Sequence, residues 1–117
     1  MAKITMLLAN GPGKPEGDIA DRIDLRVPLT MQGQVDEQAY GADDEPWPFR
    51  RTLPDGRSIS GEVVRLESGW ALRSARHEEA PLWAFETKVV RPGEYAWLRA
   101  PDGQELVFRI VNVAPEP

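Results

Sequence analysis

Two short turns constrain this chain more than any other feature. The segments Leu53–Arg57 and Ala100–Gln104 each place Pro-Asp-Gly between runs of apolar, often β-branched residues. Proline presets φ at the first turn position, aspartate bonds back to nearby backbone, and glycine takes the positive φ that closes the turn. Such a turn between two strand-like runs indicates a β-hairpin. The last two-thirds of the chain is therefore predicted to be antiparallel β structure.

The rest of the predicted strands follow from period-two alternation and from turn residues. Asp18 is predicted to cap a single helical turn that ends at Arg22. The alternating strand that begins at Ile23 contains Pro28, which cannot donate to a ladder, so we expect it at a sheet edge. Arg91–Glu94 has the proline and glycine of a type II turn. Strands are predicted at 3–9, 23–30, 49–53, 58–66, 70–76, 82–90, 94–100 and 105–113.

The final predicted strand is apolar on both of its faces. Leu106, Phe108 and Ile110 alternate with other apolar residues that include Val107 and Val111. A strand that is covered on both sides is central rather than marginal. We therefore expect Val111→Asp to cost several kcal/mol, as an unpaired buried charge does.

The fold expected from this pattern is all-β, an antiparallel β-sandwich of about eight strands. The alternative is a small, partly open β-barrel. The whole chain, 1–117, is expected to form a single β domain. It would combine a loop-rich, acidic N-terminal part (10–22 and 31–46) with a β-rich core over 49–113.

The composition excludes some classes of function but does not identify one. The chain has 117 residues, no cysteine and a net charge of −5. Residues 1–49 hold four Lys or Arg against nine Asp or Glu, whereas residues 50–117 hold ten of each. This balance argues against nucleic acid as a partner, although a local basic strip stays possible. No apolar run approaches the roughly 18 residues of a membrane helix, so we expect a soluble, cytoplasmic protein without membrane contact.

No motif marks a reaction centre. Gly11–Lys14 follows a strand, but Pro12 and Pro15 lack the backbone N–H groups that a phosphate loop needs. His77 is the one imidazole, and it is expected on an exposed loop. The grouped carboxylates, such as Asp18, Asp21 and Asp24, do not follow the order of a calcium loop. We therefore expect no catalytic residue, no metal site, no cofactor and no enzymatic activity.

The aromatic residues offer the most specific binding signal. Trp47 lies between two prolines and is followed by Phe49, Arg50 and Arg51. Proline restricts the backbone, and aromatic and arginine side chains are enriched in binding hot spots. These four residues are the candidate binding site. The alternative is that Trp47 caps an open end of the core, and the other tryptophans (Trp70, Trp83 and Trp97) are expected to pack in the core from their strands.

Two functions are compatible with these features. The first is a non-enzymatic binding or assembly module that recognises another protein, or a second copy of itself, through a sheet edge or the 40–51 loop. The alternative is a domain that binds a carbohydrate or another small ligand by stacking it on an exposed tryptophan.

Overall fold

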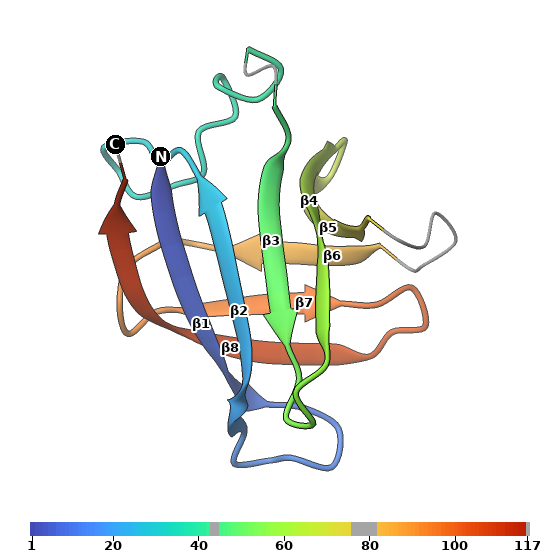
Figure 1. Cartoon of the computed structure of the whole chain (residues 1–117). Helices are drawn as coiled ribbons and strands as arrows, with labels where there is room; N and C mark the ends of the chain where they lie inside the picture. The colour runs from blue at the N-terminus through green and yellow to red at the C-terminus, as the bar shows by residue number, and fades with distance from the viewer. Residues whose placement is uncertain (43–44, 76–81, 117) are drawn as a thin grey trace.

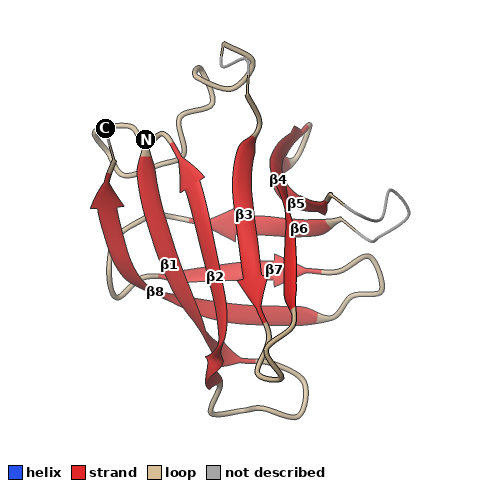
Figure 2. Ribbon diagram, in the orientation of Figure 1, coloured by secondary structure: helices blue, strands red, loops and turns tan. Residues whose placement is uncertain are grey.

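The computed structural model describes residues 1–42, 45–75 and 82–116, and every regular element in them is a β-strand (Figure 2). Each strand pairs antiparallel with the next one along the chain, and the last pairs with the first (Figure 1). The result is a closed up-and-down barrel. The strands are β1 (Ala2–Asn10), β2 (Asp18–Val27), β3 (Trp47–Thr52), β4 (Ser58–Leu66), β5 (Gly69–Ser74), β6 (Trp83–Thr87), β7 (Tyr95–Arg99) and β8 (Glu105–Pro115).

The sheet closes on itself, so the fold is the β-barrel given as the alternative and not the expected sandwich. β1 pairs with β8 from Ala2 to Asn10, so hydrogen bonds run around the whole circumference. In Figure 1, β1–β3 run steeply across β6–β8, so two walls of the barrel face each other as the two sheets of a sandwich do. The expected edge at Pro28 is wrong, since β2 lies between β1 and β3 and ends one residue earlier.

The two Pro-Asp-Gly turns are confirmed, and they have the same geometry. In the first, Leu53 N–H donates to the Arg57 carbonyl at 2.8 Å, and Gly56 has φ of 90°. In the second, Ala100 N–H donates to the Gln104 carbonyl at 2.9 Å, and Gly103 has φ of 89°. They connect β3 to β4 and β7 to β8.

The start of β2 differs from the predicted helical turn. Residues Asp18–Val27 are strand, and the register with β1 jumps, so that Leu7 faces Arg22 whereas Leu8 faces Asp18. Three residues, 19–21, therefore bulge out of the ladder. Asp21 closes this bulge and faces the barrel interior in phase with Ile23 and Leu25.

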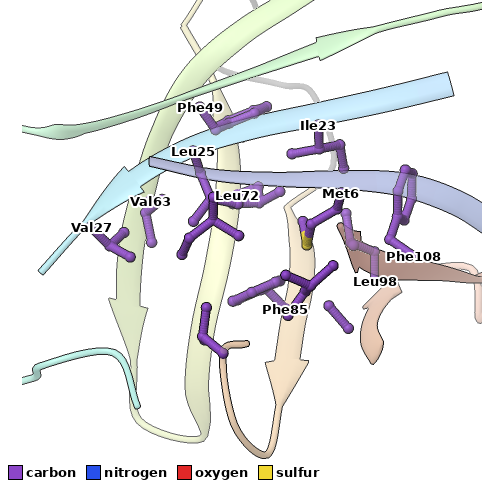
Figure 3. Packing of buried hydrophobic residues seen from close by; sticks show 14 of the residues in the cluster. Met6, Ile23, Leu25, Val27, Phe49, Val63, Leu72, Phe85, Leu98 and Phe108 are labelled. Atoms are coloured by element: carbon purple, nitrogen blue, oxygen red, sulfur yellow. The ribbon is translucent and has the colours of Figure 1, made fainter. Parts of the chain in front are cut away.

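Apolar side chains from all eight strands fill the barrel interior. Met6, Ile23 and Leu25 meet Phe85, Leu98 and Phe108 from the opposite wall (Figure 3). At Gly61 in β4, a Cβ atom would lie 1.9 Å from the Arg73 carbonyl oxygen and 2.7 Å from the Phe49 ring. Glycine is required there because backbone and an aromatic ring already occupy the space.

The outer side of β8 corrects a second expectation. Leu106, Phe108 and Ile110 point inward as predicted. Val111 is instead 42% exposed, because it follows the inward-facing Ile110 and so lies on the outer side of β8, in the bulge between the Met6–Ile110 and Thr5–Asn112 pairs. β8 is central in the barrel, yet only one of its faces is fully covered.

The segment between β2 and β3 folds across one opening of the barrel. We call this opening the upper end; it lies at the top of Figure 1, where β2 ends and β3 begins. Asp36 N–H donates to the Pro28 carbonyl at 2.9 Å, and Val90 N–H donates to the Gly33 carbonyl at 2.6 Å. Val35 and Ala39 pack against the core from this segment. The opposite opening, where β1 ends and β2 begins, is the lower end.

Candidate functional site

Strand β3 links the two ends of the barrel through alternate side chains. Trp47, Phe49 and Arg51 face the interior, whereas Pro48 and Arg50 face outward. Trp47 is 2% exposed and belongs to the core, as the alternative interpretation expected. The four candidate binding residues therefore do not form one surface: two lie in the core, Arg51 points into the lower end, and Arg50 is exposed.

An aromatic cluster closes the upper end. The ring centre of Trp47 lies 5.2 Å from that of Tyr40 and 5.5 Å from that of Trp70. Tyr40 and Trp70 also meet edge to face at 5.5 Å. The Arg65 guanidinium lies 5.1 Å from the centre of the Trp70 ring and pairs with Glu37 at 3.1 Å. Such contacts fix the orientation of the Trp70 ring.

Beside this cluster lies an open groove of about 460 Å³. It runs between the tip of the β4–β5 hairpin, the upper segment and strand β6, and Trp70 is its tryptophan. The volume falls within the roughly 300–1,000 Å³ of small-ligand sites. Its lining consists of Gln34, Val35, Glu37, Ser68, Gly69, Trp70, Ala84, Phe85, Glu86, Thr87 and Arg99.

The polar groups of the groove are mostly held in place by neighbours. Arg99 pairs with Glu105 at 2.9 Å. That hydrogen bond, followed by the charges of Glu105 and Glu86, raises the pKa of Arg99, so the guanidinium stays charged. The Thr87 hydroxyl donates to the Tyr95 carbonyl at 3.2 Å. The groove thus offers an aromatic ring, carboxylates, a guanidinium and hydroxyls, a set that suits a polar molecule with many hydroxyl groups.

The lower end contains a different arrangement. Asp21, which faces inward like Ile23, accepts two hydrogen bonds from Arg51, at 2.9 Å to Oδ1 and 2.8 Å to Oδ2. The guanidinium carbon lies 5.8 Å from the ring centres of both Trp83 and Phe108. Asp21 occupies the edge of the Arg51 guanidinium that carries these two N–H donors, so this edge is not open to a bound anion. The ion pair instead joins β2 to β3.

Two further hollows lack this combination of groups. One of about 580 Å³ lies along Pro46, Glu62 and Arg73, and none of its lining residues is aromatic. Another of about 270 Å³ lies between Tyr40, Trp47 and Glu62, where the Trp47 ring is itself part of the core. The groove beside Trp70 is therefore the strongest candidate site.

Other chemistry considered in the sequence has no counterpart in the described residues. Across 1–42, 45–75 and 82–116, no three His, Asp or Glu side chains gather closely enough to hold a metal ion. The same part of the chain contains no apolar helix long enough to cross a bilayer. His77 lies outside the described residues, so its expected place on an exposed loop stays a prediction.

Sequence reasoning missed the groove because its members come from distant parts of the chain. Trp70 was predicted to pack in the core, and it does so with one part of its ring while the rest lines the groove. Glu37 and Arg65 face each other only because the upper segment folds back over the barrel. Comparison of the chain with protein-family models, curated proteins and solved structures found no match.

Proposed function

We propose that this protein is a non-enzymatic binding module that holds a small, polar, ring-shaped ligand in the groove beside Trp70. A saccharide is the ligand class that fits the lining best. The observation that carries the proposal is the partly exposed Trp70 ring in a groove of about 460 Å³. An aromatic face packs against the apolar face of a sugar ring, while carboxylate and hydroxyl groups bind its hydroxyls.

The test is a saccharide panel followed by intrinsic tryptophan fluorescence, with calorimetry on any responder. Glu86→Gln removes an exposed carboxylate from the groove and should weaken binding about tenfold, near the lower end of the range for a hydrogen bond to a charged group. Glu16→Gln makes the same change in the lower loop and should leave binding unchanged. Trp70→Leu should abolish binding while the circular dichroism spectrum stays that of the folded chain.

Two results would count against a ligand at this site. The first is a full panel with no change in emission. The second is a responding sugar whose affinity is the same for Trp70→Leu and for the unmodified chain, since the ligand would then bind elsewhere.

A second candidate function is recognition of another protein, and the side chain of Met31 favours it. Met31 is fully exposed at the tip of a turn. The turn is ordered, because Thr30 N–H donates to the Gln34 carbonyl at 2.7 Å and Gly33 N–H to the Thr30 carbonyl at 3.0 Å. The backbone of an ordered turn loses little entropy when a partner covers its apolar side chain.

Closure of the barrel limits how such a partner binds. Each of the eight described strands has a neighbour on both sides, so recognition through a free sheet edge is wrong for them. A photo-crosslinking amino acid at position 31 should give one discrete adduct in cells, and the same amino acid at position 57, on the β3–β4 turn, should not. Equal adducts at both positions would contradict a specific surface.

A further inference from the structure

Basic side chains cluster on the outer face of four neighbouring strands, β8, β1, β2 and β3. Lys3 of β1, Arg22 and Arg26 of β2, Arg50 of β3 and Arg109 of β8 project from adjacent strands; we call these five residues the basic strip. Register places four of them close together: Lys3 faces Arg26, and Leu7 faces Arg22 on one side and Arg109 on the other. Arg50 faces Asp24 across β2 and β3. Three of the four basic residues in 1–49 thus lie on this face, although that part of the chain carries the acidic surplus.

Few carboxylates neutralise the basic strip. Asp24 lies within it and pairs with Arg22 at 2.8 Å, and Glu116 pairs with Arg26 at 3.3 Å. No described carboxylate forms an ion pair with Arg50 or with Arg109. Both arginines are exposed, and Arg50 makes one long hydrogen bond, 3.5 Å, to the Ser58 hydroxyl.

This concentration of like charge does not serve the fold. Exposed ion pairs contribute about 0–1 kcal/mol each, and like charges on neighbouring strands destabilise a sheet. A local positive face on a chain of net charge −5 therefore calls for another explanation. Arginine binds carboxylates through two parallel hydrogen bonds, and the four arginines of the basic strip are suited to that contact.

We propose that the basic strip is the docking surface for an acidic, extended segment of a partner protein. Strands lie about 4.8 Å apart, so Arg22 and Arg109, with β1 between them, start from backbones about 10 Å apart. Side chains on one face of an extended segment repeat every ~7 Å. The two spacings differ by about 3 Å, which the long, flexible arginine side chains can span, so a segment laid across the strands can bring two carboxylates to Arg22 and Arg109. This surface is separate from the groove beside Trp70 and does not depend on it.

The surrounding charges favour an acidic protein segment over nucleic acid. Nucleic-acid binders usually present a basic face on a basic domain, because affinity grows with the number of phosphates contacted. Here the upper segment adds carboxylates of Asp36 and Glu37, and Glu45 follows before β3. A long polyanion that continues past the basic strip toward the upper end meets repulsion, whereas a short acidic segment does not.

The test measures binding of a fluorescein-labelled ten-residue glutamate peptide by anisotropy, at 50 mM and 500 mM salt. Arg50→Gln/Arg109→Gln should weaken binding about tenfold, because each exposed ion pair is worth up to about one kcal/mol. Arg57→Gln/Arg91→Gln removes the same charge from two turns outside the basic strip and should change binding less than twofold. The high-salt measurement should weaken binding for the unmodified chain.

Each alternative has a distinct outcome. Equal weakening by the two double variants would overturn the basic strip as a site and leave only the general effect of charge. Tighter binding of a ten-nucleotide oligo-dT would assign the face to nucleic acid instead. Dimers in light scattering that Arg50→Gln/Arg109→Gln dissociates would show that a second copy occupies it. No binding of the peptide at 50 mM salt would end the proposal, without bearing on the groove.

Discussion

Asp21 and Arg51 form a two-pronged ion pair inside the lower end of the barrel, between strands β2 and β3. Their side chains are 4% and 15% exposed. Asp21 faces inward in phase with Ile23 and Leu25, whose side chains also lie inside the barrel. A buried charge left alone is costly, so the two residues are expected to be strongly coupled.

Asp21→Leu is therefore expected to lower the free energy of unfolding by about 3–5 kcal/mol, because it leaves the Arg51 charge buried without its partner. Arg51→Met should cost a similar amount for the converse reason. The double variant Asp21→Leu/Arg51→Met should cost less than the two single changes together. Urea denaturation of all four proteins measures this coupling, and strictly additive losses would contradict it.

Substitutions at Val111 and Phe108 should differ greatly in how much they destabilise the protein, although both residues belong to β8. Phe108 is fully buried, so Phe108→Ala should cost about 3–5 kcal/mol through the cavity that it leaves. Val111→Asp places a charge on an exposed bulge and should cost less than about 1 kcal/mol, as surface changes do. Thermal unfolding of the two variants side by side tests the register. A large loss from Val111→Asp would mean that this side of β8 is covered.

Gly61→Ala should destabilise the barrel by about 3 kcal/mol, the upper range for overpacking. The added methyl group meets the Arg73 carbonyl oxygen, which is backbone and cannot turn aside. Ser60→Ala, one position away on the exposed side of β4, is the matched control and should change the unfolding midpoint little. A Gly61→Ala protein as stable as this control would show that β4 and β5 separate easily.

Asp24 should make part of the stability depend on pH. Burial acts to raise the pKa of its carboxyl group, but hydrogen bonds from Arg22 and Thr5 outweigh burial and lower the pKa below 3.8. A carboxyl group whose pKa is lower in the folded state than in the unfolded state stabilises the fold fully at a pH above its unfolded-state pKa. This stabilisation is lost as the pH falls through its folded-state pKa.

Asp24→Asn should therefore melt at a lower temperature than the unmodified chain at pH 6, and the difference should shrink as pH falls below 3.8. Melting curves between pH 6 and pH 2 measure this convergence. A constant difference across that range would show that Asp24 contributes through its shape alone and not through its charge.

Local chemistry made part of this fold predictable. The two Pro-Asp-Gly turns carry their own hydrogen-bonding groups and their own glycine, so the hairpins at Leu53–Arg57 and Ala100–Gln104 could be predicted without knowledge of the rest. The inward face of β8 followed from alternation. Val111 lies on the side of β8 that alternation predicts, opposite to Ile110, but that side is the outer surface of the barrel and is exposed there, which no local pattern shows.

The closure and the site depend on contacts between distant residues. Whether eight strands form a sandwich or a barrel is decided by the pairing of β1 with β8, and no local pattern encodes it. The same holds for Glu37 beside Arg65, and for the meeting of Trp70 with Tyr40. Arg50 was singled out for its place beside Trp47, yet its neighbours on the basic strip come from other strands.

The pairing of β1 with β8 also sets an order of events during translation. Ala2 pairs with Pro115, so β1 is synthesised well before β8, the strand that becomes its second neighbour. Until then one side of β1 presents unpaired N–H and C=O groups, the kind of edge to which other chains add. Contacts between such distant residues slow folding. The nascent chain therefore keeps one unpaired side of β1 until β8 has been synthesised.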